Sequence, residues 1–152
     1  MRLRHDALVS TTPPDHDGLA QEGHLALRVH MLARDVNVQG TIFGGVILSL
    51  IDQAGFYEAR LHGLHRWVTV AMNAVEFRRP VHPGDIVSLY TSTSRTGRSS
   101  VTVEVRVFAE RFRGGQTVAV TTATLTMVAV DRDSNPISFT SPPTLSAGDT
   151  SS

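Results

Sequence analysis

The chain has 152 residues, including 14 arginines, no lysine, 14 acidic residues and seven histidines, and it contains no cysteine. The absence of cysteine excludes thiol catalysis, cysteine-ligated metal sites and a disulfide scaffold. A formal net charge of zero argues against a general nucleic-acid binder, and the chain length predicts one domain with a core of its own.

The two ends of the sequence show no sustained periodicity. Residues 1–23 mix Arg, His, Pro, Asp and Gly, and we expect a flexible N-terminal arm that is not a signal peptide. Residues 140–152 are rich in Ser, Thr, Pro and Gly, which predicts a disordered tail after a domain over residues 24–139. Since no apolar run approaches the ~18 residues of a membrane span, we expect a soluble, cytoplasmic protein without a membrane partner.

Between the two ends, one segment has the period of a helix and five have the features of strands. The segment 25–32 is a plausible first strand, and apolar residues recur at intervals of three and four over 42–61. Polar and apolar residues alternate over 100–107, and 67–77, 86–96 and 116–130 are rich in β-branched or aromatic residues. Turn formers separate the last four segments, at Pro83-Gly84, Thr96-Gly97 and Gly114-Gly115. This order predicts an α+β fold in which consecutive strands form an antiparallel sheet and the helix lies across one face.

The predicted helix carries one carboxylate on a face that is otherwise uncharged. At 100° per residue, Asp52 points away from an apolar stripe that we expect to face the core, and Glu58 lies at the edge of this stripe without an assigned role. The stripe consists of Phe43, Val46, Ile47, Leu50, Ala54, Tyr57 and Leu61. The face around Asp52 consists of Gly45, Leu48, Ser49, Gly55, Phe56 and Ala59. A helix that is apolar nearly all round is buried on both sides, so we expect another subunit to cover this face.

In such a cleft, Asp52 is a candidate general base or nucleophile, because carboxylates are rarely buried without a partner or a function. The alternative is an ion pair between Asp52 and an arginine across the interface. Gly44 and Gly45 begin the same helix, where free backbone N–H groups and the helix dipole favour an anion or a polarised carbonyl oxygen. Asn37 adds an uncharged amide that could hold a water molecule.

Four motifs together resemble the acyl-CoA thioesterase (acyl-CoA hydrolase) family of the hotdog-fold superfamily. They are Asp-Val-Asn-Val-Gln-Gly-Thr-Ile-Phe-Gly-Gly over 35–45, Ile-Asp-Gln-Ala-Gly over 51–55, Val-Glu-Phe-Arg-Arg-Pro-Val-His-Pro-Gly-Asp over 75–85 and Gly-Arg-Ser-Ser over 97–100. They follow the family's order and spacing, and the likeness runs from near Val29 to Ile137. Each motif is weak alone, but the set is highly specific.

The resemblance implies a hotdog fold, in which an antiparallel sheet wraps one long central helix. It implies a homodimer with a continuous sheet, often assembled into hexamers as trimers of dimers. It also implies hydrolysis of an acyl-CoA thioester, with coenzyme A as part of the substrate and no separate cofactor or metal. By matched position, Asp52 activates water or attacks the thioester, and Asn37 comes from the partner chain. The backbone N–H of Gly45, helped by Gly44, polarises the thioester carbonyl.

Two groups of residues match family positions near the nucleotide and phosphates of coenzyme A. Arg78 and Arg79 lie at the end of a predicted strand, and Arg98 opens a turn that continues with Ser99 and Ser100. The arginine fork suits phosphate. Each of these interpretations has an alternative. The arginines could be solvated surface charges, and the absence of lysine could reflect codon usage in a GC-rich genome. Ser99 and Ser100 could simply cap the turn.

Other functions are less consistent with the sequence. A non-catalytic acyl-CoA binding or sensor protein on the same fold is the main alternative, although residues 1–23 are too short for a helix-turn-helix. A hotdog dehydratase or hydratase would need a catalytic histidine near the helix, and His62 is poorly placed for that role. The histidines show no metal-ligand spacing, and His62 and His65 more simply favour the helix dipole. A Gly-x-Ser-x-Gly elbow is absent, and a P-loop needs a lysine.

Overall fold

The computed structural model describes residues 23–147, so most of the predicted N-terminal arm and the last five residues lie outside the described part. Five strands, one short 3₁₀ turn and one long helix follow one another in this part of the chain. They are β1 (His24–His30), η1 (Ala33–Asp35), α1 (Gly44–Arg60), β2 (Arg66–Met72), β3 (Ile86–Thr96), β4 (Ser100–Glu110) and β5 (Thr117–Val130). The predicted helix and five strands are all present. Within this range, no helix is long and apolar enough to cross a membrane.

The strands form one antiparallel sheet in the order β1-β3-β4-β5-β2. The prediction of four consecutive strands joined by short turns is confirmed for β3, β4 and β5 but is wrong for β2, which pairs with β5, so that residues 73–85 must cross to β3. The predicted strand 67–77 ends at Met72. Beyond it the chain still follows β5 through single bonds such as Arg78 N–H to Val120 O at 2.9 Å. Pro80 and Pro83 then lack the amide donors that a regular ladder needs.

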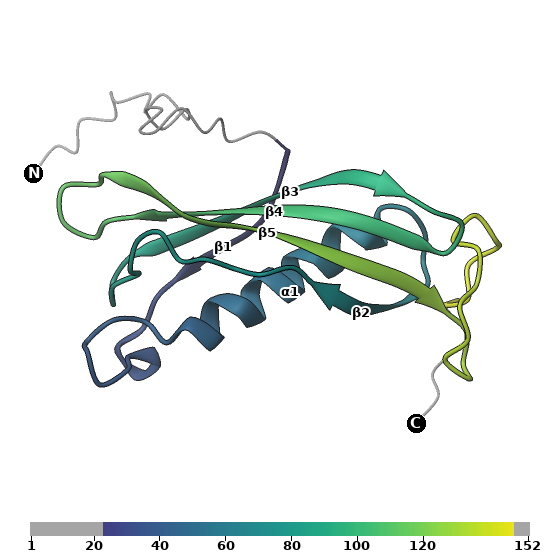
Figure 1. The fold of residues 1–152 in the computed structure, drawn as a ribbon, viewed down its shortest axis with the longest axis horizontal. Coiled ribbons are helices and arrows are strands. Elements are labelled where there is room, and N and C mark those ends of the chain that lie inside the picture. Colours follow the sequence, from purple (N-terminus) through teal and green to yellow (C-terminus); the bar gives the residue numbers. More distant parts are fainter. Residues whose placement is uncertain (1–22, 148–152) are drawn as a thin grey trace, which may run out of the picture.

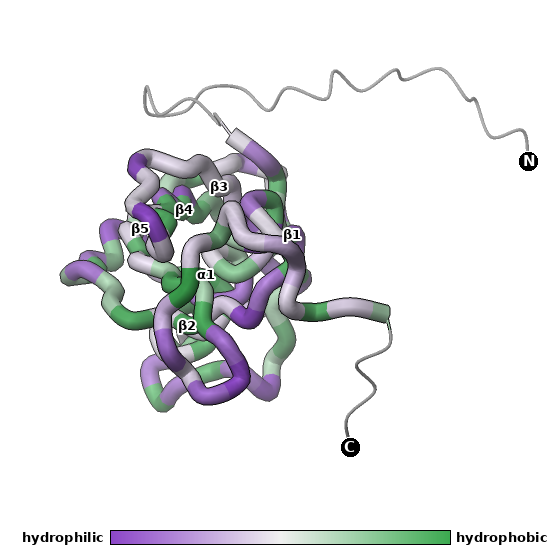
Figure 2. Tube along the Cα trace, turned by 90° about the vertical axis from the view of Figure 1, so that its right-hand side faces the viewer, coloured by the Kyte–Doolittle hydropathy of each residue, from purple (hydrophilic) through white to green (hydrophobic). Residues whose placement is uncertain are grey.

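The sheet curves around α1, so that the helix lies against its concave face (Figure 1). The same arrangement is seen end-on in Figure 2, where the strands lie on several sides of the helix. The core fills the space between the two layers with fully buried aliphatic side chains. These include Ile47 and Ile51 from α1, Val87 and Leu89 from β3, Val103 and Val105 from β4, and Leu125 and Met127 from β5.

The helix face that contacts the sheet differs from the predicted stripe. Phe43, Tyr57 and Leu61 are 60, 45 and 67% exposed. Phe43 and Leu61 are the cap residues of α1, so neither lies within the helix body that contacts the sheet. The buried residues of α1 are Ile47, Leu50, Ile51, Ala54, Gly55, Glu58 and Ala59. The core-facing direction is thus rotated toward Gly55, Glu58 and Ala59.

Gly55 packs against the sheet, although the sequence predicts it on the opposite face of the helix, around Asp52. A Cβ atom at this position would lie 3.1 Å from Cδ2 of Leu125 on β5. Its absence lets the middle of α1 approach the sheet closely. This contact fixes the rotation of the helix and places Asp52 beside the edge strand β2.

The ordered chain continues beyond Phe139, where the sequence predicts the domain to end. The buried imidazole of His65 bonds Phe139 O through Nε2 at 2.9 Å and Thr144 Oγ1 through Nδ1 at 3.1 Å. The N–H groups of Thr144 and Leu145 donate to Leu64 O. Residues 140–145 therefore lie against the segment that follows α1.

Candidate active site

The N-terminus of α1 leaves backbone N–H groups without a side-chain cap. Phe43 occupies the N-cap position, its side chain makes no capping hydrogen bond, and the first turn holds no acidic residue. A Cβ atom at Gly44 would lie 3.4 Å from the ring of Phe77, and one at Gly45 would lie 3.3 Å from the ring of Phe43. The two glycines therefore let these rings lie against the first turn of the helix, whose uncapped N–H groups suit an oxyanion or a polarised carbonyl.

A cavity of about 310 Å³ opens beside this helix terminus. Gly44 and Phe77 line it together with Arg78 and Arg79. Arg78 is exposed, whereas Arg79 is half-buried and donates from Nη1 to Ala119 O at 3.4 Å. The structure thus brings the first pair of predicted coenzyme A ligands to the same place as the predicted oxyanion donors, and both features favour an anionic ligand.

Asp52 lies two turns further along α1 and is exposed in the single protomer. Thr69 of β2 donates from Oγ1 to Asp52 Oδ1 at 2.5 Å, and the same hydroxyl oxygen lies 3.1 Å from Sδ of Met127. Among residues 23–147, no ion pair with an arginine was found for Asp52. Thr69 holds one carboxylate oxygen in place and leaves Oδ2 for another donor.

Sequence reasoning missed Thr69, because its contact with Asp52 depends on how β2 and α1 pack together. Its position after Trp67 and Val68 marks it only as a residue of a strand. The partner of a helical carboxylate on a neighbouring strand has no local sequence signal.

Asn37 organises the loop that leads into α1. Its Oδ1 accepts hydrogen bonds from the N–H groups of Gln39 at 3.0 Å and Thr41 at 3.2 Å, and its Nδ2 donates to Thr41 Oγ1 at 3.0 Å. Gly40, with a φ of 82°, closes this turn. The side chain amide carries a second hydrogen, so Asn37 can structure the loop and still donate to another group.

The predicted catalytic groups do not converge within one protomer. Gly45 and Asp52 are seven residues apart on one helix, which is about 10 Å along its axis. One thioester carbonyl therefore cannot touch the Gly45 N–H and the Asp52 carboxylate of the same chain directly.

The second group of predicted coenzyme A ligands lies at the opposite end of α1. Arg98 is exposed and Ser99 and Ser100 are half-buried in the turn between β3 and β4 (Figure 1). Backbone bonds fix this turn, from Ala129 N–H to Ser99 O at 2.8 Å and from Phe139 N–H to Arg98 O at 3.3 Å. The helix between the two groups spans roughly 25 Å. One protomer thus carries two separate clusters of candidate coenzyme A ligands, one at each end of α1.

Comparison with known proteins places the chain in a family. The family model described as the thioesterase superfamily matches residues 39–116. An uncharacterised acyl-CoA thioester hydrolase of Zymomonas mobilis is 34% identical over 126 residues, which is 83% of this chain and 85% of the relative.

Solved structures extend the likeness to the fold. HI0827, described as a hexameric broad-specificity acyl-coenzyme A thioesterase, superposes with a TM-score of 0.78 at 34% identity over 84% of this chain and 88% of that one. Cj0915, a hexameric hotdog-fold thioesterase of Campylobacter jejuni, gives a TM-score of 0.71 at 42% identity over 76% of this chain and 91% of that one. This chain therefore belongs to the hotdog-fold acyl-CoA thioesterase family within the thioesterase superfamily.

Proposed function

We propose that this thioester hydrolase cleaves an acyl-CoA thioester into a carboxylic acid and coenzyme A. The observation that carries the proposal is a single helix with uncapped N–H groups at Gly44 and Gly45 beside a cavity containing two arginines, and a carboxylate anchored by Thr69 further along. The name of the Zymomonas relative and the description of HI0827 support acyl-CoA as the substrate class.

In the proposed reaction, Asp52 acts as the general base. Thr69 holds Oδ1, and Oδ2 takes a proton from a water molecule that attacks the thioester carbon. The carbonyl oxygen gains negative charge, which the Gly45 N–H and the helix terminus stabilise, and the thiolate of coenzyme A then leaves and takes up the proton. A general base contributes typically ~10²–10⁴-fold, and one oxyanion donor contributes ~3–4 kcal/mol to lowering the barrier.

The complete site requires two protomers in this proposal. Asp52 from one chain meets Gly45 and Asn37 from the partner, because the groups of one chain are too far apart for one carbonyl. Exposed apolar side chains beside Asp52 support a covering subunit, with Leu48 36% and Val70 57% exposed. Asp52 contacts Thr69 of β2, and Val70 belongs to the same strand, which is an edge strand of the sheet and can pair with a second copy. We expect a dimer as the minimal unit and three such dimers in a hexamer; HI0827 and Cj0915 are both described as hexameric.

The same pairing accounts for the two clusters of candidate coenzyme A ligands. Arg78 and Arg79 of one protomer and the turn of Arg98, Ser99 and Ser100 of its partner would share one nucleotide. Bidentate arginine contacts to phosphate are charge-assisted and strong. Coenzyme A enters here only as part of the substrate and product.

The proposal is tested by thiol release from a panel of acyl-CoAs of different chain length. Asp52→Asn keeps the size of the side chain and removes the base, so we expect turnover to fall by ~10²–10⁴-fold. Asp133→Asn, which changes an exposed carboxylate in a distant turn, is the matched control and should retain wild-type turnover. Unchanged turnover by Asp52→Asn contradicts the assignment of the base. Tight acyl-CoA binding by the wild type without thiol release would instead identify a binding protein.

A further inference from the structure

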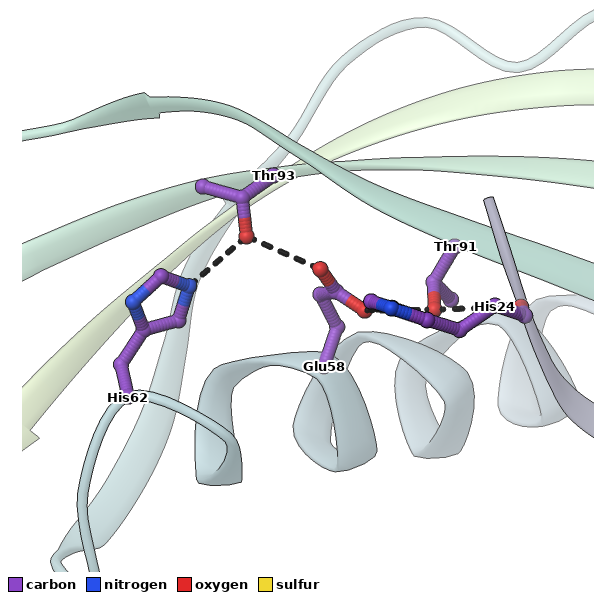
Figure 3. A network of polar contacts seen from close by, with 5 residues as sticks. All are labelled: His24, Glu58, His62, Thr91 and Thr93. Atoms are coloured by element: carbon purple, nitrogen blue, oxygen red, sulfur yellow. Dashed lines mark hydrogen bonds and ion pairs between the residues drawn. The ribbon is translucent and has the colours of Figure 1, made fainter. Parts of the chain in front are cut away.

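A cluster of polar side chains lies between the C-terminal half of α1 and the sheet (Figure 3). The side chain of Glu58 points toward the sheet and is only 4% exposed. Its Oε2 is bonded by Nδ1 of His24 at 2.9 Å and Oγ1 of Thr91 at 2.8 Å, and its Oε1 accepts from Oγ1 of Thr93 at 3.0 Å. The carboxylate therefore joins α1 to β1 and β3.

The short hydrogen bonds around Glu58 point toward the carboxylate, and Thr91 Oγ1 has a second, longer contact of 3.5 Å with His24 O. The single hydroxyl proton of Thr93 goes to Glu58, so its oxygen accepts from Nε2 of His62 at 2.8 Å. Burial alone raises the pKa of Glu58, but hydrogen bonds from His24, Thr91 and Thr93 and the charge of His24 outweigh it, and the net pKa is lowered. The cluster is arranged around an ionised carboxylate.

The part of β1 that precedes the bulge is weakly fixed by apolar packing. His24 and Leu25 are exposed, whereas Ala26, Leu27 and Val29 are partly buried and pack against the core. A β-bulge lies between Leu25 and Leu27, and beyond it only Leu25 and His24 pair with β3. Register is poorly specified where a strand lacks a buried face, and a slip of one residue turns every side chain to the other face.

The contacts at the other end of β1 do not reach across the bulge. Met31 N–H donates to Asp85 O and Gly84 N–H to Met31 O, both at 2.9 Å. The ion pair of Arg28 with Glu110 is 39–50% exposed, and pairs of this kind contribute little. Glu58 Oε2, in contrast, contacts both members of the cross-strand pair of His24 and Thr91.

We propose that Glu58 fixes the register of β1 against β3 on the N-terminal side of the bulge. The carboxylate accepts hydrogen bonds from the two residues that must face each other, and a bulge-free pairing would move His24 from Thr91 to Ser92 and break this arrangement. Buried charges seldom raise net stability over a packed apolar residue, but they can select one arrangement among several. This role is independent of the proposed hydrolysis.

Disulfide trapping tests the proposal directly, because the chain contains no cysteine of its own. Leu25→Cys with Tyr90→Cys links native partners. Ala26→Cys with Tyr90→Cys links residues that become a direct cross-strand pair when the bulge is lost. With Glu58 present, we expect rapid cross-linking of the first pair alone. In a Glu58→Leu background, we expect the second pair to cross-link at least ~10-fold faster than it does with Glu58, once register specificity is removed.

Two controls separate register from stability. Glu110→Leu removes the other carboxylate that contacts β1 and should leave the native cross-linking pattern unchanged. Glu58→Leu leaves the donors of His24, Thr91 and Thr93 without their acceptor, so its midpoint of thermal unfolding should fall, and cross-linking is compared at a temperature well below the midpoints of both proteins. If Glu58→Leu fails to fold, Glu58→Gln keeps the size of the side chain and takes its place in the same assay. An identical cross-linking pattern with and without Glu58 overturns the proposal.

Discussion

Asp52 and Glu58 lie six residues apart on one helix and occupy opposite environments. Asp52 is exposed and receives a single hydroxyl, whereas Glu58 is buried and receives donors from two strands. A carboxylate that retains an unfilled oxygen can accept a proton from water, and one with saturated oxygens is suited to holding structure. The number of hydrogen bonds that each carboxylate accepts therefore distinguishes Asp52, the proposed catalytic residue, from Glu58, the proposed structural residue.

Thr69 is a positioning residue in this account, since it contacts Asp52 and not the substrate. Thr69→Val keeps the shape of the side chain and removes the donor, and a hydrogen bond to a charged group contributes about 1.5–3 kcal/mol. We expect kcat to fall by ~10–100-fold with little change in KM. Steady-state kinetics check this, and Thr69→Ser, which restores the hydroxyl, should recover most of kcat. A loss confined to KM would argue against positioning.

At the residue scale, the sequence predicts Asp52 and Gly45 as candidate site residues, but it indicates neither Thr69 as a partner of Asp52 nor a role for Glu58. Asp52 is conspicuous because its neighbours on the helix are uncharged. Glu58 could not be interpreted because its partners, such as His24 and Thr91, come from strands far away in the chain. Contacts of this kind depend on how helix and strands pack together, and the local periodicity of the sequence carries no information about that packing.

At the element scale, the helical period locates α1 well, and the richness in β-branched and aromatic residues locates β3. The predicted strand 86–96 coincides with β3, and the predicted helix extends two residues beyond α1 at its start and one at its end. Strand order is not contained in the period, because an edge strand and a central strand can share the same alternation. The long crossing of 73–85 was therefore missed, and the rotation of α1 depended on the close approach of Gly55 to Leu125.

Acid should loosen the start of β1 before the rest of the sheet. The lowered pKa of Glu58 means that its contribution to stability is present above its usual value of 4.5 and is lost as pH falls through the folded pKa. Hydrogen exchange of β1 amides should therefore accelerate at a pH below 4.5, as protonation removes the acceptor that faces His24 and the Thr93–His62 pair. Glu58→Leu should abolish this pH dependence. Equal acceleration in β4 would point to global acid unfolding.

The crossing segment depends on a second charged contact. Arg111 donates from Nη1 to Asp85 Oδ2 at 2.5 Å and to Pro80 O at 3.0 Å, and Asp85 is 3% exposed. Arg111→Met leaves a buried carboxylate without its cation, so we expect a loss of about 3 kcal/mol in the free energy of unfolding. Urea denaturation measures it. Adding Asp85→Asn should recover part of the loss, and strictly additive effects would contradict the pairing.

At the scale of the whole molecule, one protomer is an incomplete enzyme in this account. The oxyanion donors and one arginine pair lie at the start of α1, the base lies in its middle, and the second coenzyme A cluster lies beyond its end. The uncovered apolar side chains of Leu48 and Val70 beside Asp52 are where a partner would close the site. The lack of charged residues around Asp52 in the sequence already indicates that another subunit covers this face of α1. Only the fold shows that Gly45 and Asp52 of one chain are too far apart to act on the same carbonyl.

Subunit mixing tests the central claim, that Asp52 of one protomer works with Asn37 and Gly45 of another. Asn37→Asp keeps the loop-forming acceptor Oδ1 and removes the amide donor, and Asp52→Asn removes the base. Each variant alone should be nearly inactive in acyl-CoA hydrolysis. In co-expressed mixed oligomers, some sites regain both native groups, so we expect about a quarter of wild-type activity. Activity no higher than that of either variant alone would contradict the shared site.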